Sequence, residues 1–441
     1  MKIQLSDHFT YGKLIRFSLP SIIMMIFTSI YGVIDGLFVS NLAGKTPFAA
    51  INLIWPYIMA LGSVGFLVGT GGTALISKTL GMGDRKKANE IFSLLTVTCI
   101  VCGIGLTVLS LFFLRPVAKL MGAEGEILEN AVLYGAIVLP AATAYILQFA
   151  YQSFCVAAEK ANLSLIMTIA SGVCNIILDA LLVPFFGLVG AALATAIAQV
   201  VGAVIPLVYF SRPNSSLLRL VKFSIDWKSL WRTFTNGSSE LVSNLSLSIV
   251  GILYNLQLFA YAQENGIAAY GVIMYVNMVF IAIYIGFVIG AAPLFGFHYG
   301  ADNRSELKNL FRKSLILLSI TAVAMTALAM LLAKPIALIF VGYDKVLTDM
   351  TTRGLMLYSL SFLLCGINLF GSNMFTAFNN GLISALISFA RTLVCQIAAV
   401  MILPIFWELD GIWLAITAAE LVAFVITVIC FILFRKKYHY A

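Results

Sequence analysis

Twelve apolar runs, each long enough to cross a lipid bilayer, follow one another along this chain of 441 residues. A transmembrane helix needs about 20 apolar residues, and a backbone inside lipid must satisfy its hydrogen bonds within a helix or a closed barrel. Because 61% of the residues are hydrophobic and only 10% are charged, we predict an all-α integral membrane protein. Its twelve transmembrane helices are expected at approximately 14–40, 48–77, 91–114, 129–157, 162–184, 187–210, 238–262, 267–299, 311–333, 350–378, 382–405 and 411–434.

The lysines and arginines predict the orientation of the chain. With the amino terminus inside, the cytoplasmic segments carry 20 of these residues and the opposite segments carry 6. Since positive charge concentrates on the cytoplasmic side, we expect a multi-pass protein of the inner (cytoplasmic) membrane with both termini in the cytoplasm. The first run is too long for a signal peptide and is expected to remain as the first helix. The net charge of +8 then reflects topology, and no nucleic-acid partner is expected.

An internal repeat recurs at an offset near 220 residues. The segment Gly81–Phe92 matches Gly300–Phe311, with Gly, Arg and Phe in register at an offset of 219. Six helices in each half make the two repeats parallel, so we predict an N-lobe over residues 1–210 and a C-lobe over 238–441. The linker 211–237 mixes basic and apolar residues, which fits either an amphipathic segment on the lipid surface or a simple tether.

Two acidic residues, Asp35 and Asp179, lie inside apolar runs. A charge near the middle of a bilayer costs roughly 2.5–3.5 kcal/mol, so intramembrane acids mark ion or proton paths. Asn175 lies one helical turn before Asp179, and Thr195 on the next helix can reach the same face. This set of oxygen ligands predicts a site for H⁺ or Na⁺ in the N-lobe. Pro20 fits either a bend that couples this site to the position of the first helix or a static kink near the start of that helix.

Other polar residues form stripes along apolar helices. Gln148 and Gln152 share a face with Cys155 and Glu159, which fits a cavity lining or hydrogen-bonded packing between helices. A second stripe on the seventh helix includes Glu240 and Asn255, while the roles of Glu420 and Arg391 stay open. The candidate lining of a substrate cavity comprises Tyr31, Gln148, Tyr151, Gln152, Glu240, Asn255 and Met274.

These motifs resemble the multidrug and toxic compound extrusion (MATE) family over nearly the whole chain. The similarity rests on Pro20, on Asp35, on the loop Gly81–Phe92, on Asn175-Ile-Ile-Leu-Asp179, and on the segment Phe186-Gly-Leu-Val-Gly-Ala-Ala-Leu-Ala-Thr195. The chain looks nearer the MepA-like and DinF-like bacterial branches, because it has no acid between Asp349 and Glu408, where some members carry one.

The resemblance implies two six-helix lobes that form a V around a central cavity. It also implies a cation-coupled antiporter that exports amphipathic, cationic drugs by alternating access. Asp35, Asn175, Asp179 and Thr195 match the family's N-lobe cation site, and Pro20 matches a proline associated with bending of the first helix. We expect H⁺ or Na⁺ as the coupling ion, no other cofactor, the lipid bilayer as surroundings and a monomeric state.

Two other functions compete with this interpretation. A lipid-linked oligosaccharide flippase of the related superfamily would place several basic residues in the cavity, and here Arg391 is the only candidate. A membrane enzyme such as a prenyl transferase would need an acid cluster of the type Asp-Asp-x-x-Asp, which the sequence lacks. We therefore expect a transporter and not an enzyme.

Overall fold

The computed structural model describes residues 3–441 and every side chain in that range except those of Leu37 and Ser248. Helices follow one another with no strand among these residues. Eight of them are long and apolar enough to cross a membrane, or nine if the bent pair α9 and α10 forms one span. The elements are α1 (Tyr11–Phe38), η1 (Val39–Ala43), α2 (Lys45–Gly81), α3 (Arg85–Leu120), α4 (Gly125–Val138), η2 (Leu139–Ala141), α5 (Ala142–Ala157), α6 (Ala161–Ser211), α7 (Trp227–Gly300), α8 (Arg304–Val341), α9 (Lys345–Ser359), α10 (Phe362–Ala377), α11 (Gly381–Phe389), η3 (Ala390–Val394) and α12 (Cys395–Tyr438).

The three longest helices each contain a sharp corner. In α6 the corner is Gly187, which has φ 53°, and the Ser171 hydroxyl donates to the Ala198 carbonyl at 2.7 Å across it. A straight helix would separate two residues so far apart in sequence by about 40 Å, so α6 is a hairpin of two antiparallel limbs. Corners at Gln263 in α7 and Glu408 in α12 have similar positive φ values, 51° and 48°. With α9 and α10 taken as one span and each of these three hairpins counted as two, residues 3–441 contain the predicted twelve spans.

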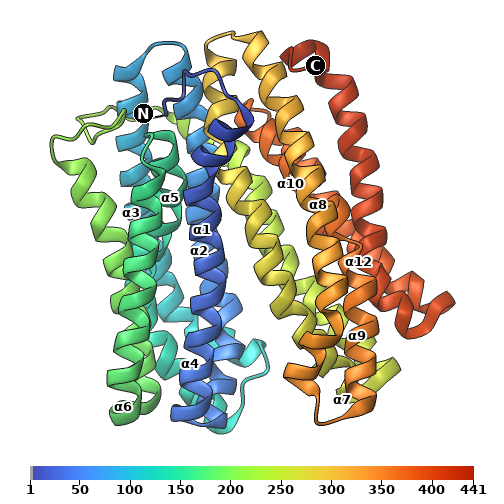
Figure 1. Ribbon diagram of the computed structural model, residues 1–441. Helices are drawn as coiled ribbons and strands as arrows, with labels where there is room; N and C mark the ends of the chain where they lie inside the picture. The colour runs from blue at the N-terminus through green and yellow to red at the C-terminus, as the bar shows by residue number, and fades with distance from the viewer. Residues whose placement is uncertain (1–2) are drawn as a thin grey trace.

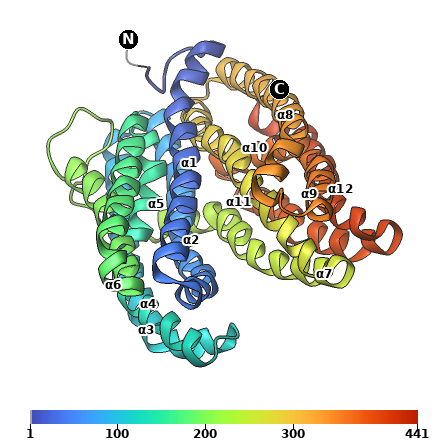
Figure 2. The same cartoon turned by 60° about the horizontal axis from the view of Figure 1, so that its bottom comes forward.

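The helices form two lobes arranged as a V. The N-lobe contains α1–α6 and the C-lobe contains α7–α12, and the two come together near the face that carries both chain termini (Figure 1). Toward the opposite face they diverge (Figure 2). We call the first face the termini face.

The two repeated loops begin their helices in the same way. The Asp84 side chain accepts a hydrogen bond from the Lys87 amide at the start of α3, and the Asn303 side chain accepts one from the Glu306 amide at the start of α8. Both are N-caps that satisfy an otherwise unpaired amide of the first turn. Their offset of 219 residues equals the sequence repeat, so the internal symmetry extends to local hydrogen bonding.

Glycines bring the lobes into direct backbone contact. A Cβ at Gly81 of α2 would collide with the carbonyl of Phe297 in α7, and a Cβ at Gly300 would collide with that of Lys78. Small residues allow membrane helices to approach this closely. We call this contact, together with the equivalent one between Gly71 and Gly237, the glycine seam.

A second close approach joins α1 to the later limb of α7. Gly286 and Gly290 are four residues apart and face the backbone of Ile22 and Ser18 in α1. Further along, the Ser29 hydroxyl donates to a backbone carbonyl of α7 at 3.2 Å. The G-x-x-x-G spacing therefore sets how closely α1 lies against the C-lobe.

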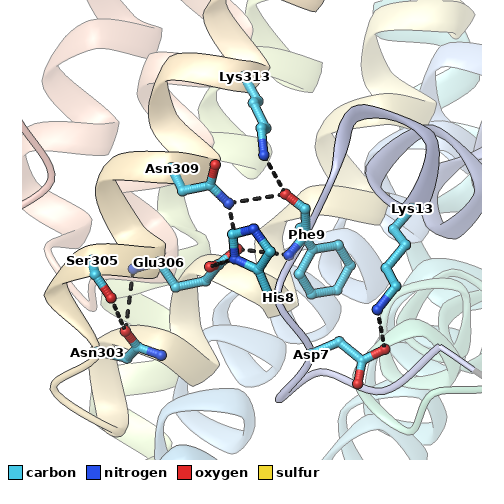
Figure 3. A network of polar contacts seen from close by, with 9 residues as sticks. All are labelled: Asp7, His8, Phe9, Lys13, Asn303, Ser305, Glu306, Asn309 and Lys313. Atoms are coloured by element: carbon cyan, nitrogen blue, oxygen red, sulfur yellow. Dashed lines mark hydrogen bonds and ion pairs between the residues drawn. The ribbon is translucent and has the colours of Figure 1, made fainter.

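The segment before α1 is anchored to α8 by a polar network (Figure 3). The buried Glu306 carboxylate accepts a hydrogen bond from the Phe9 amide at 2.9 Å and lies 2.6 Å from Nδ1 of His8. The Phe9 carbonyl accepts from Asn309 at 2.9 Å and from Lys313 at 2.6 Å. Both polar groups of the Phe9 backbone are thus bonded to the C-lobe.

The same segment also contacts the N-lobe. The Leu5 amide donates to Oε1 of Glu159, between α5 and α6, at 2.7 Å. The side chains of Leu5 and Phe9 are fully buried. The residues before α1 therefore bridge the two lobes at the termini face.

The ends of the predicted linker 211–237 are helical. Helix α6 continues to Ser211 and α7 begins at Trp227, so only 212–226 lies outside a helix. The linker backbone is held against α3, where Asn89 and Ser93 accept hydrogen bonds from the amides of Arg219 and Val221 at 2.8 Å.

Candidate functional site

The intramembrane acids converge inside the N-lobe. Asp35 lies near the end of α1, fifteen residues after the half-buried Pro20, and Asn175 and Asp179 lie one turn apart on the first limb of α6. Asp179 is fully buried, Asn175 is 3% exposed, and Thr195 on the second limb is 8% exposed. The α6 hairpin brings its two limbs together and so places Thr195 near the residues of the first limb.

The carboxylates of Asp35 and Asp179 lie within interaction range of one another, and Asn175 lies beside Asp35. Even so, Oδ1 of Asp35, Oδ1 of Asn175 and both carboxylate oxygens of Asp179 have no well-aligned hydrogen-bond donor among residues 3–441. Buried polar atoms are usually paired, and an unpaired buried charge is costly. The cluster therefore has acceptor oxygens that a proton or a small cation would satisfy.

Tyr134 on α4 completes this cluster and was missed from the sequence. Its hydroxyl donates to the Thr195 hydroxyl at 3.4 Å and lies within electrostatic range of both carboxylates. A signal was present, because Tyr134 precedes Gln148 by fourteen residues, close to four helical turns, and so continues that polar stripe. We call Asp35, Tyr134, Asn175, Asp179 and Thr195 the N-lobe cluster.

The other residues predicted for the N-lobe side of a cavity have different surroundings. Tyr31 lies beside Asp35 and packs against Gly172 of α6. Gln148 and Gln152 are 4% and 1% exposed, and Tyr151 is fully buried with its ring stacked on Phe210 at 5.9 Å. These three residues of α5 thus lie within the interior of the N-lobe. Asn255 is exposed on the surface of α7.

A cavity of about 430 Å³ lies mostly within the C-lobe. Met25, Phe66 and Thr70 of the N-lobe line one side, so it reaches the region between the lobes. Of the predicted lining residues, Glu240 and Met274 face it, and Arg391 and Glu420, whose roles the sequence left open, line it as well. We call it the C-lobe cavity. Its volume is in the range of small-molecule sites, and its walls are largely apolar.

The charged residues of the C-lobe cavity form two separate hydrogen-bonded groups. Arg391 Nε donates to Glu420 Oε1 at 2.8 Å, and Asn368 Nδ2 donates to Glu420 Oε2 at 2.7 Å. Glu240 Oε1 accepts a longer bond from Asn373 Nδ2 at 3.4 Å. The Arg391 and Glu420 side chains are 9% and 1% exposed. A buried ion pair therefore lines the same cavity as a carboxylate without an ion-pair partner among the described residues.

Neither region has the ligands of a transition-metal centre. Within residues 3–441 there is no group of three or more His, Cys, Asp or Glu side chains arranged to hold a metal ion. The N-lobe cluster offers carboxylate, amide and hydroxyl oxygens instead, which suit Na⁺ or a proton.

Comparison with known proteins matches these features to one family. The MatE family model matches residues 20–181 and 241–402, two stretches displaced by 221 residues, in agreement with the internal repeat. The multidrug export protein MepA of Staphylococcus haemolyticus (strain JCSC1435) is 28% identical over 420 residues, which cover 94% of this chain and 92% of that protein. MepA of Staphylococcus saprophyticus is 26% identical over 407 residues, which cover 91% of this chain and 88% of that protein.

Solved structures share the fold at lower sequence identity. A MATE protein in complex with MaL6 superposes with a TM-score of 0.91 at 24% identity, covering 98% of this chain and 97% of that one. An outward-facing multidrug resistance transporter of the MATE family and MOP superfamily superposes with a TM-score of 0.91 at 24% sequence identity. The match covers 99% of this chain and 98% of that one.

Proposed function

This chain belongs to the MatE family, and from that premise we propose that it exports amphipathic organic cations in exchange for H⁺ or Na⁺. The observation that carries the ion coupling is the set of unpaired oxygens in the N-lobe cluster. A fully buried Asp179 beside Asp35, with no hydrogen-bond partner for either of its carboxylate oxygens among the described residues, requires a proton or a metal cation to balance its charge.

The drug is proposed to bind in the C-lobe cavity. Its apolar walls suit the hydrophobic part of an amphipathic molecule, and Glu240 supplies a carboxylate for a cationic centre. The names of the MepA relatives support drugs as the transported class. The cationic residue Arg391 is already paired with Glu420, which does not favour the pyrophosphate group of a lipid-linked oligosaccharide.

Alternating access would join the two sites. We propose both termini in the cytoplasm of the inner membrane, on the basis of the Lys and Arg distribution. In that orientation the lobes are closed on the cytoplasmic side and the V opens outward. Only a ligand with different affinities for the two facing states can shift their equilibrium, so the ion and the drug must favour different states.

The division into lobes belongs to the same proposal. We propose a monomer with an ion-binding N-lobe over 1–210, a cytoplasmic linker over 211–237 and a drug-binding C-lobe over 238–441. In this scheme Pro20, which lies on α1 within the stretch that contacts the C-lobe and fifteen residues before Asp35, lets that helix bend when the N-lobe cluster changes its occupancy.

The test is transport in proteoliposomes with H⁺ and Na⁺ gradients imposed separately and ethidium as the probe. We expect at least one gradient to drive ethidium flux, and Asp35→Asn and Asp179→Asn to reduce it at least tenfold. Asp302→Asn, whose side chain is 76% exposed at the termini face, is the matched control and should leave the flux unchanged. Full ion-driven flux in both intramembrane variants would reject the ion role, and no flux under either gradient would reject antiport.

A further inference from the structure

We propose that Arg391 sets the charge of the ligand that the C-lobe cavity accepts, so that the cavity selects organic cations with a single positive charge. This inference rests on the proposed function and names the substrate class of the same site more narrowly. In this inference Arg391 neutralises Glu420 and thereby determines how many positive charges a bound ligand can carry.

Arg391 lies in a distinctive local structure. It is part of η3, a π-helical turn between α11 and α12, and its side chain is almost fully buried. Single π-helical turns of this kind are frequent at functional sites. The turn places the guanidinium against Glu420 on the other limb of the α12 hairpin and against Cys365 of α10, whose sulfur lies 3.2 Å from Nη2.

The charges of the C-lobe cavity do not cancel. Glu420 is neutralised by Arg391 at 2.8 Å and accepts a further hydrogen bond from Asn368. Glu240 is bonded to the neutral amide of Asn373, and Arg391 acts on it only at longer range. Two carboxylates and one guanidinium therefore leave one negative charge for a ligand.

This balance favours a monovalent cation for a physical reason. A charge moved from water into an apolar site is costly unless an opposite charge meets it there. A ligand with one positive centre is matched by Glu240, whereas the second centre of a divalent ligand would remain unpaired. The stacked rings of Tyr254 and Tyr270, 5.2 Å apart, line the same cavity and suit the aromatic part of such a ligand.

The charge set is specific to the C-lobe. At the repeat offset of 220, Arg391 corresponds to Ser171 and Glu420 to Val200, and neither is ionisable. The N-lobe cluster in turn has two carboxylates and no arginine among its members. The two repeats thus share the same arrangement of helices but differ in their buried charged residues.

The test uses two dyes that share a ring system, the monocation ethidium and the dication propidium. Their equilibrium binding is measured by fluorescence on the purified full chain. For the native protein we expect tighter binding of ethidium. In Arg391→Gln, which frees Glu420, the ratio of the two affinities should shift at least tenfold toward propidium. Arg391→Lys keeps the positive charge and should keep the native ratio.

The double variant Arg391→Gln/Glu420→Gln is the decisive control. It removes both members of the ion pair, leaves Glu240 as the single charge, and should return the ratio to the native value. A double variant that keeps the ratio of Arg391→Gln, or an unchanged ratio in Arg391→Gln, would overturn the selector role while ethidium binding by the native protein still supports the proposed function. Absence of binding of either dye by the native protein would overturn both.

Discussion

Replacing Glu306 with alanine should release the segment that joins the lobes at the termini face. The carboxylate is 5% exposed and lies 2.9 Å from the Phe9 amide, 2.7 Å from Nδ2 of Asn309 and 2.6 Å from Nδ1 of His8. Each hydrogen bond to a charged group contributes about 1.5–3 kcal/mol, and the bonds are not additive. We therefore expect a local loss of about 3–4 kcal/mol for the attachment of this segment.

Hydrogen exchange measured by mass spectrometry checks this value. Because about 1.4 kcal/mol corresponds to a factor of ten, the amides of Leu5 and Phe9 should exchange roughly 150- to 1000-fold faster in Glu306→Ala. The amides within α8 should keep their protection. Asp302→Ala removes an exposed carboxylate just before the same helix and is the control. Unchanged exchange at Phe9, or equal acceleration in the control, would refute the reasoning.

Three further perturbations have defined outcomes. Tyr134→Phe removes a hydroxyl of the N-lobe cluster and should lower ion-driven flux in vesicles about three- to tenfold, since one hydrogen bond is lost. Bonding to Lys87 lowers the pKa of Asp226 to about 2. The stabilising effect of this carboxylate is therefore present above about pH 4 and is lost as the pH falls toward 2. The difference in melting temperature between the native protein and Asp226→Asn should narrow over that interval. Gly286→Val should destabilise the protein by about 1–3 kcal/mol in a melting assay, whereas Gly271→Val, with open space around it, should not.

The spans and their corners were predictable because lipid imposes a simple rule on the sequence. Every segment inside the bilayer must be apolar and helical, so run length and breaks determine the helices. The predicted breaks at 185–186, 263–266 and 406–410 contain or adjoin the observed corners Gly187, Gln263 and Glu408. The approach of Asp35 to Asp179 was also foreseeable, because acids within a membrane almost always face the interior of the helix bundle and pair with one another there.

Contacts that depend on neighbouring helices were not predictable in this way. Asn255 follows Glu240 by fifteen residues, which rotates it about 60° from the same face, and only the packing of α7 decides that this side is exposed. The pairing of Arg391 with Glu420 needs both the α12 hairpin and a π-helical turn. The bond between His8 and Glu306 joins residues 298 apart, and no periodicity in the sequence relates them.

The glycine seam has a mechanical consequence. Where side chains interlock, one surface can slide over another only after many of them change rotamer together. At Gly71, Gly81, Gly237 and Gly300 the contact between α2 and α7 is made instead by bare main chain. At these four points no side chains have to separate when the two helices move against each other, and the hydrogen bonds of the amino-terminal residues are among the contacts that such a movement would have to break.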